Sequence, residues 1–204
     1  MTRVFALFAA AAVAIGLAVG GFVALRGGGD DPFADCRDTQ VAGAAAIGGP
    51  FTLTDAAGNR VTDAEAIIGP TLVYFGYTFC PDICPTDVSR NALAAETLAE
   101  RGIDVGQVFI TIDPERDTAD VVRDFTSAID PEIVGLTGTP KEIASAADAY
   151  RVYYRKNGEG EYYLMDHSTF TYLVAPGVGF LDVYRSDATP EAVADSVACF
   201  AARL

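Results

Sequence analysis

The sequence contains few of the side chains that bind soft or borderline metal ions. Its 204 residues include no tryptophan, two methionines, four cysteines and a single histidine, His167. Structural zinc sites usually take four protein ligands. The chain has no second histidine, and only Cys80 and Cys84 lie close together in sequence, so a zinc site would need a carboxylate or water as its fourth ligand. The composition therefore argues against a structural zinc protein.

Basic residues are also scarce. The chain has 14 Lys and Arg residues against 28 Asp and Glu residues, which gives a formal net charge of −14 at pH 7. A surface of this sign repels nucleic acid and anionic lipid headgroups. We therefore exclude nucleic-acid binding. The acidity has two remaining explanations, attraction of a basic partner or solubility alone.

One long apolar run is present at the N-terminus. Residues 4–25 carry no charge, and a helix of this length spans the ~30 Å of a bilayer core. The run exceeds the roughly 7 to 15 apolar residues of a secretory signal, and no convincing cleavage site follows it. The sequence predicts an uncleaved transmembrane helix, with a cleaved signal and a buried core helix as the alternatives.

The short N-terminal stub before this run favours an orientation that delivers the rest of the chain across the membrane. We expect the domain in the bacterial periplasm or an equivalent compartment, where disulfides persist. A Gly- and Asp-rich stretch follows the run and indicates a flexible linker. The predicted organisation is a membrane anchor at 1–26, a linker and domain start at 27–44, and one folded domain at 45–204.

Strands and helices alternate through this domain. Apolar, β-branched and aromatic runs predict strands, and helical periodicity with Thr or Pro at the start predicts helices. The predicted strands are 51–54, 71–77, 107–112, 133–136, 170–174 and 180–184, and the predicted helices are 88–98, 118–128, 140–150 and 190–202. A hairpin is expected around 156–160. This order predicts an α/β fold in which helices cover both faces of a central mixed sheet.

The thiol pair lies where a predicted strand ends and the next helix begins. Cys80 and Cys84 occur in the run Gly76-Tyr77-Thr78-Phe79-Cys80-Pro81-Asp82-Ile83-Cys84-Pro85, an arrangement typical of thioredoxin-like folds. A helix N-terminus lowers the pKa of a nearby thiol. Two soft sulfur ligands and the imidazole of His167 suit Cu(I) and can also hold Cu(II).

Other chemistry remains open for the same residues. Cys80 and Cys84 supply the two thiols that disulfide exchange requires, although their spacing has three intervening residues rather than two. They could also form a plain structural disulfide or an incidental buried pair. The prolines and the polar Asp82 between the thiols argue against burial. Asp82 itself is a candidate modulator of the thiols or weak metal contact, or only a turn residue.

Three sequence blocks resemble the signature of the Sco/SenC family: Gly76 to Pro85, Thr111-Ile112-Asp113-Pro114-Glu115-Arg116-Asp117-Thr118, and Asp166-His167-Ser168-Thr169. They occur in the family's order, and the resemblance covers about 45–204. It implies a membrane-tethered thioredoxin-like protein that binds copper through Cys80, Cys84 and His167. Where thioredoxins place a cis-proline facing the thiols, this block has no proline and carries a histidine instead.

The resemblance also implies a function and partners. Family members assemble cytochrome c oxidase, chiefly its dinuclear copper site. It follows that this chain would be a copper metallochaperone rather than an enzyme, and its partners would be the copper-accepting oxidase subunit and, as a second candidate, another copper chaperone. The alternative is a thiol:disulfide oxidoreductase that reduces the cysteines of that subunit. Redox or copper sensing through a membrane partner is a third class.

Several charged residues are candidate neighbours of the site. Asp166 precedes His167 and is expected to orient its imidazole. Three residues follow the strand expected beside the thiol strand and are candidates to rim the site and meet a partner, or else to form local turns: Asp113, Arg116 and Asp117.

The two remaining cysteines, Cys36 and Cys199, lie at opposite ends of the predicted domain. The ends of a domain are often close in space, so we expect them to form a disulfide. The alternative is two free, partly buried thiols. A bridge closing such a long loop would stabilise the fold by roughly 4–5 kcal/mol in the entropic model.

Overall fold

The computed structural model describes residues 31–37, 43 and 46–204. The chain divides into two compact units, Met1–Asp35 and Cys36–Leu204, and the second unit contains the central sheet. The transmembrane helix predicted at 4–25 lies outside the described residues. Within them, no helix combines the length and the apolar character that crossing a membrane requires.

A seven-stranded mixed sheet forms the centre of the domain. In sheet order its strands are β2 (Arg60–Thr62), β1 (Thr52–Asp55), β5 (Val134–Thr137), β4 (Gly106–Thr111), β3 (Thr71–Gly76), β8 (Thr171–Ala175) and β9 (Gly179–Tyr184). The three central neighbours β5, β4 and β3 run parallel, and the outer pairs are antiparallel. All six residues of β3 are buried, as expected for a strand covered on both faces. The predicted α/β fold with a central mixed sheet is confirmed.

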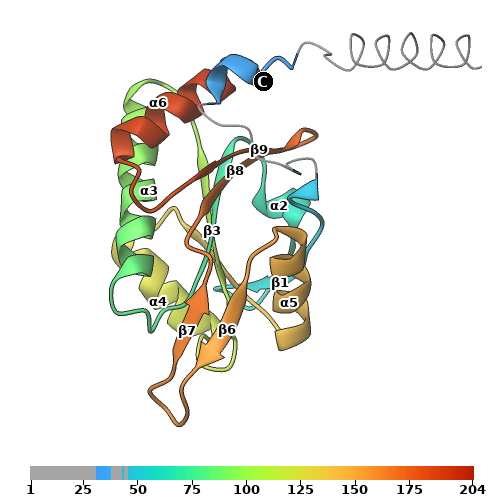
Figure 1. Ribbon diagram of the computed structural model, residues 1–204, viewed down its shortest axis with the longest axis vertical. Helices are drawn as coiled ribbons and strands as arrows, with labels where there is room; N and C mark the ends of the chain where they lie inside the picture. Colours follow the sequence, from blue (N-terminus) through green and yellow to red (C-terminus); the bar gives the residue numbers. More distant parts are fainter. Residues whose placement is uncertain (1–30, 38–42, 44–45) are drawn as a thin grey trace, which may run out of the picture. The chain divides into compact units, whose positions relative to one another are not determined.

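Helices cover both faces of this sheet (Figure 1). The helices are α2 (Asp63–Ala66), α3 (Ile83–Glu100), α4 (Ala119–Ile129), α5 (Pro140–Ala149) and α6 (Pro190–Ala201). The long α3 lies with α4 and α6 on one face, and α2 and α5 lie on the other. Helices α4, α5 and α6 each begin after a threonine whose hydroxyl accepts a backbone hydrogen bond, which satisfies one of the free N–H groups of the first turn.

The thiol helix begins earlier than its sequence indicates. Periodicity over 88–98, with Pro85 as the first helical residue, predicts a helix that begins at 85, whereas α3 starts at Ile83 and places Pro85 third. Proline is tolerated there because the first-turn N–H groups have no partner within the helix. Cys84 consequently lies inside the first turn of α3, and Cys80 lies just before it. The four-residue α2 was not predicted, and it is too short to show helical periodicity.

The chain between α5 and β8 forms a separate two-stranded sheet that extends from the domain (Figure 1). It consists of β6 (Tyr154–Asn157) and β7 (Leu164–His167), paired antiparallel. Gly158 and Gly160 in the connecting segment have positive φ angles of 105° and 76°, a conformation that glycine adopts without steric cost. This is the predicted hairpin, and His167 is the last residue of its second strand.

The structure joins Cys36 and Cys199 in a disulfide. Cys199 lies on α6, and the two Cα atoms are 5.6 Å apart although 163 positions separate them in sequence. The Arg203 guanidinium lies against both sulfur atoms. The bridge therefore connects the start of the Cys36–Leu204 unit to its last helix.

Candidate metal centre

The two thiols are brought together by the turn that connects β3 to α3. We call residues 77–82 the thiol loop. The backbone N–H of Cys84 donates a hydrogen bond to Cys80 Sγ over 3.3 Å, so the N-terminus of α3 directs a donor and its positive dipole end at this sulfur. A Cβ atom at Gly76 would approach the Tyr74 ring to 2.8 Å and Cys84 Sγ to 3.1 Å. Glycine at this position thus allows the close approach of strand and thiol.

His167 reaches the thiols from the hairpin. Its Nε2 atom lies 3.4 Å from Cys84 Sγ, and its Nδ1 atom lies 2.8 Å from the carbonyl oxygen of Ser168. A proton on Nδ1 would be donated to that carbonyl, which leaves the Nε2 lone pair facing the sulfur atoms. Tyr74 and Tyr77 contact the ring edge-on, with centroid distances of 6.4 and 5.8 Å. The imidazole is therefore held with its free nitrogen toward the thiols.

Asp166 does not orient this ring as predicted. Its carboxylate instead accepts hydrogen bonds from Arg155 and Asn157 on the neighbouring strand. Adjacent residues on a strand point to opposite faces, so the side chains of Asp166 and His167 diverge. The carbonyl of Ser168 takes the place that we expected Asp166 to fill.

The three candidate ligands form one compact cluster. Cys80 Sγ, Cys84 Sγ and one ring nitrogen of His167 all lie within 4.8 Å of one another. Bonds of about 2.0–2.3 Å to nitrogen and sulfur separate the ligands of one ion by roughly 3.5–4 Å, so small movements would let all three bind it. Among the described residues no carboxylate joins this cluster. The four protein ligands of a structural zinc site are therefore not brought together.

The thiol pair is electrostatically asymmetric. A hydrogen bond from the Cys84 thiol lowers the pKa of Cys80 to about 3; burial opposes this shift, and the Cys84 N–H reinforces it. The same hydrogen bond and burial raise the pKa of Cys84. The two sulfur atoms therefore share one proton, which resides on Cys84. At neutral pH the metal-free pair thus offers one thiolate, which is both a nucleophile and a soft ligand.

Both thiols are more buried than the sequence indicates. Cys80 is 9% exposed and Cys84 is fully buried, although the polar loop predicted exposure. The reason is tertiary: both thiols pack into the hydrophobic core, and His167 from β7 contacts Cys84. Asp82 remains exposed at the N-cap of α3. Its side chain does not cap the helix, whereas its carbonyl accepts a hydrogen bond from the Thr86 hydroxyl.

Asp117 does not rim the site; it lies inside the domain and binds Thr78 of the thiol loop. Its carboxylate is fully buried and accepts hydrogen bonds from the Thr78 N–H, the Thr78 hydroxyl and the Thr111 hydroxyl, at 2.9, 2.6 and 2.6 Å. Burial raises the pKa of Asp117, although these hydrogen bonds work in the opposite direction. Of the two roles left open for Asp117, the partner contact does not fit, because no part of its carboxylate reaches the surface.

Replacement of Asp117 by asparagine should lower the free energy of unfolding by about 2 kcal/mol. One accepting oxygen becomes an NH2 group that faces donors, and a buried donor without an acceptor costs roughly 1–3 kcal/mol. Urea unfolding measures the change. Asp120→Asn, an exposed substitution on α4, is the matched control and should stay within about 0.5 kcal/mol of the original. Equal losses of unfolding free energy in the two variants would contradict the role of Asp117 in supporting the thiol loop.

Asp113 and Arg116 hold the hairpin against the thiol loop. Asp113, 3% exposed, accepts hydrogen bonds from Arg116 Nε at 2.6 Å and from the Tyr163 hydroxyl at 2.7 Å. Arg116 also donates to the Tyr163 carbonyl and stacks on the rings of Tyr163 and Phe79, at 3.6 and 4.7 Å from their centroids. We call Asp113, Arg116 and Tyr163 the arginine clamp. Asp113 is thus an internal group, and its carbonyl accepts the Arg116 N–H, which is the local turn role rather than the partner contact among the two alternatives.

Loss of the arginine clamp should loosen the hairpin that carries His167. In Arg116→Ala, hydrogen exchange of the β6 and β7 amides should become at least about tenfold faster, which corresponds to about 1.4 kcal/mol of local stability. Exchange monitored by mass spectrometry measures this. Arg123→Ala removes a guanidinium whose two ion pairs lie at the surface and should leave hairpin exchange unchanged. Equal exchange rates in Arg116→Ala and the unmodified chain would refute the clamp.

Fold and site together define a class of protein. A thiol pair at a strand-to-helix junction, a mixed sheet covered on both faces, and a histidine presented from the segment before β8 describe a thioredoxin-like domain with a Cys-Cys-His site. The SCO1/SenC family model matches residues 39–202. This chain belongs to the SCO1/SenC family, as the resemblance of its sequence blocks indicated.

Known proteins of this family are close in sequence and structure. The chain is 50% identical over 200 residues to protein SenC of Rhodobacter capsulatus. The aligned region covers 98% of this chain and 90% of SenC. It is 44% identical to the mitochondrial SCO1 homolog 1 of Arabidopsis thaliana over 79% of its own length, but spans only 49% of that protein. Two solved structures with copper bound are also similar to it. Arabidopsis thaliana ScoI has 42% identity and a TM-score of 0.73, and covers 76% of this chain and 98% of its own.

The second, Bradyrhizobium japonicum ScoI, has 40% identity and a TM-score of 0.68, and covers 75% of this chain and 98% of its own. A more distant relative, BsSco, belongs to the Sco family of cytochrome c oxidase assembly proteins, and a disulfide switch has been identified in it. BsSco is 25% identical, with a TM-score of 0.60, and covers 76% of this chain and 93% of its own.

Proposed function

We propose that this chain binds copper through Cys80, Cys84 and His167 and delivers it to the dinuclear copper site of cytochrome c oxidase during assembly. The convergence of these three side chains within 4.8 Å is the observation that carries the proposal. Two sulfur ligands and one imidazole form a soft set that favours Cu(I) and can hold Cu(II). The two copper-bound ScoI structures support the choice of metal.

Each ligand has a separate part in taking up the ion. Cys80, which has the lowered pKa, is the thiolate available at neutral pH. Cys84 keeps its proton until the metal replaces it, so binding releases a proton. His167 then closes the site from the hairpin with Nε2. Three protein ligands leave room for a ligand of the acceptor, and the ion can pass by stepwise ligand exchange.

Localisation is part of the same proposal. The apolar run at 4–25 would anchor the chain and place the domain in the periplasm, beside the membrane-embedded oxidase. The Cys36–Cys199 disulfide suits a compartment in which disulfides persist. The copper-accepting oxidase subunit is the proposed partner, and a second copper chaperone is a candidate donor of the ion.

The thiol pair also supports a second candidate function, reduction of the acceptor subunit. The lowered pKa of Cys80 beside a second thiol suits disulfide exchange. Cys80 thiolate would attack a disulfide of the acceptor and release one acceptor thiolate. Cys84 would then attack the mixed disulfide and release the other. The pair loses two electrons and ends as a Cys80–Cys84 disulfide, while the acceptor gains two thiols.

Transfer measured in two parallel reactions separates these functions. The copper-loaded reduced chain is mixed with an apo acceptor subunit whose cysteines are reduced, and the copper-free reduced chain is mixed with the oxidised acceptor. We expect copper to move in the first reaction while Cys80 and Cys84 remain thiols. Thiol reduction is the better assignment if no copper moves and the second reaction yields a Cys80–Cys84 disulfide.

A further inference from the structure

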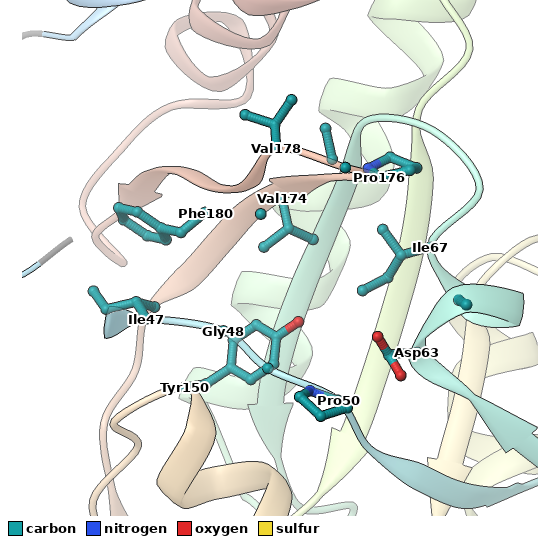
Figure 2. Close-up of a pocket in the computed structure, with 15 residues that line it drawn as sticks. Ile47, Gly48, Pro50, Asp63, Ile67, Tyr150, Val174, Pro176, Val178 and Phe180 are labelled. Atoms are coloured by element: carbon teal, nitrogen blue, oxygen red, sulfur yellow. The ribbon is translucent and has the colours of Figure 1, made fainter. Parts of the chain in front are cut away.

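A second pocket lies away from the metal centre. It has a volume of about 540 Å³ and lies between the segment before β1, helix α2, the end of α5 and the β8–β9 turn (Figure 2). Its position follows from the sheet register. Val174, which lines it, pairs with Thr71 at the start of β3, whereas the thiol loop follows Gly76 at the other end of this strand. The pocket and the thiols are therefore at opposite ends of β3.

The walls of this pocket are mostly apolar. Aliphatic and aromatic side chains contributed by four separate segments line it, including Ile47, Ile67, Val174, Val178 and Phe180. Its volume is within the roughly 300–1,000 Å³ that is typical of small-molecule sites. Walls of this kind suit a ligand with an apolar body.

Two polar side chains point into the apolar space, the Asp63 carboxylate and the Tyr150 hydroxyl (Figure 2). Asp63 Oδ1 accepts a hydrogen bond of 3.3 Å from the Phe51 N–H, which leaves Oδ2 available. Tyr150 is 2% exposed, and its ring packs against Phe75 and Tyr172 at centroid distances of 5.2 and 5.6 Å. Its hydroxyl makes no hydrogen bond with any described residue.

The Tyr150 hydroxyl faces the pocket and is not sealed inside the core. A ligand that enters the pocket can therefore reach this hydroxyl and hydrogen-bond to it. Burial and then the charge of Asp63 raise the pKa of Tyr150, so its hydroxyl remains neutral at physiological pH. The space between the two groups thus offers a carboxylate acceptor and a phenolic oxygen that can also accept.

The charge of the pocket selects the ligand. Among the described residues that line it, Asp63 is the one ionisable carboxylate and there is no Lys, Arg or His. The Asp63 carboxylate would repel an anion, and a neutral molecule would leave its charge without a counter-charge. A primary ammonium donates charge-assisted hydrogen bonds to the Asp63 carboxylate and can also donate to the Tyr150 oxygen. We propose that this pocket binds a primary ammonium group carried on an apolar chain. The source is a free alkylamine or the side chain of a lysine in a partner protein.

Titration with three small probes of similar size tests the charge preference. Butylammonium, butanol and butanoate are added to the 15N-labelled full chain in detergent micelles, and amide chemical shifts around residues 47–50, 63–67 and 174–180 are followed to saturation. We expect butylammonium to bind at least about tenfold more tightly than butanol, and butanoate not to bind. Equal affinities for the ammonium and the alcohol, or shift changes elsewhere only, would overturn the proposal.

Variants assign the binding to the two polar groups. Asp63→Asn keeps an oxygen for the Phe51 N–H and should weaken butylammonium binding at least about tenfold, which is about 1.4 kcal/mol. Tyr150→Phe should weaken it about threefold. Asp124→Asn removes the same charge from the exposed surface of α4, on the opposite face of the sheet, and should change nothing. Unaltered binding in Asp63→Asn would refute the site.

A variant that fills the pocket provides a test that does not touch the polar groups. Ala64 is exposed on α2 and lines the pocket, so Ala64→Leu should abolish butylammonium binding without disturbing the core. Ala99→Leu places the same side chain on the exposed surface of α3 and is the control. Retained binding in Ala64→Leu would contradict the assignment. Binding of N-acetyl-lysine methylamide as tightly as butylammonium identifies a lysine side chain as the source, and binding of butylammonium alone identifies a free amine.

Discussion

Replacement of His167 by alanine lowers the affinity of the reduced chain for Cu(I) at least about a hundredfold. Loss of a residue that only supports a metal ligand typically costs 10–100-fold in affinity, and loss of a ligand itself should exceed this. The histidine is also difficult to replace locally. No other histidine exists in the chain, and no carboxylate of the described residues joins the cluster. Competition with a chromogenic Cu(I) chelator measures the affinity.

A matched control exists on the same strand. Asp166→Asn alters the adjacent side chain, which bonds to Arg155 and Asn157 instead of the imidazole, so we expect affinity within about threefold of the original. Cys84→Ser replaces a soft sulfur by a hard oxygen and should resemble His167→Ala. Unchanged copper affinity in His167→Ala would exclude the ligand assignment.

The same variants separate the two candidate functions in cells. If His167→Ala abolishes copper binding and also prevents oxidase assembly, copper delivery is the working activity. Preserved assembly in His167→Ala together with lost assembly in Cys84→Ser would instead assign the activity to the thiols. The comparison is informative because only the first variant leaves both thiols in place.

Removal of the Cys36–Cys199 disulfide should lower the free energy of unfolding by about 4–5 kcal/mol. The bridge closes a loop of 163 residues, and in the entropic model a cross-link of this span removes many conformations from the unfolded chain. The double variant Cys36→Ser/Cys199→Ser, unfolded in urea, measures the loss. Its native contacts are otherwise retained, so copper affinity should stay the same.

A reductant supplies the internal control for this prediction. Dithiothreitol should lower the stability of the unmodified chain toward that of the double variant, and it should leave the double variant itself unaffected. The bridge would be energetically unimportant if the unmodified chain and the double variant unfolded at the same urea concentration under oxidising conditions.

Local sequence was sufficient where neighbouring residues determine the structure. The run of apolar and β-branched residues predicted β3, and Thr with Pro at the starts of α5 and α6 predicted those helices. Cys80 and Cys84 could be placed at a strand-to-helix junction for the same reason. These features depend on contacts over a few residues, which a short sequence window contains.

Long-range placement was predictable only where a sequence pattern marked it. The three sequence blocks identified His167 as a partner of the thiols across more than eighty residues, and the resemblance to Sco/SenC proteins carried that inference. The early start of α3 escaped prediction because Pro85 normally marks a first helical position. Tolerance of proline at the third position depends on free N–H groups, which periodicity does not reveal.

The sequence by itself determined the fold class and the chemical identity of the candidate ligands. The tertiary structure decided which side chains support them: the Ser168 carbonyl faces the imidazole, and Asp117 and Asp113 are internal. It also placed Asp63 and Tyr150 around one pocket. The physical reason is that the sequence does not give the direction in which a side chain points. A carboxylate has the same sequence letter whether it points to solvent, a neighbouring hydroxyl or a cavity, and only the packing of distant elements determines which of these it meets.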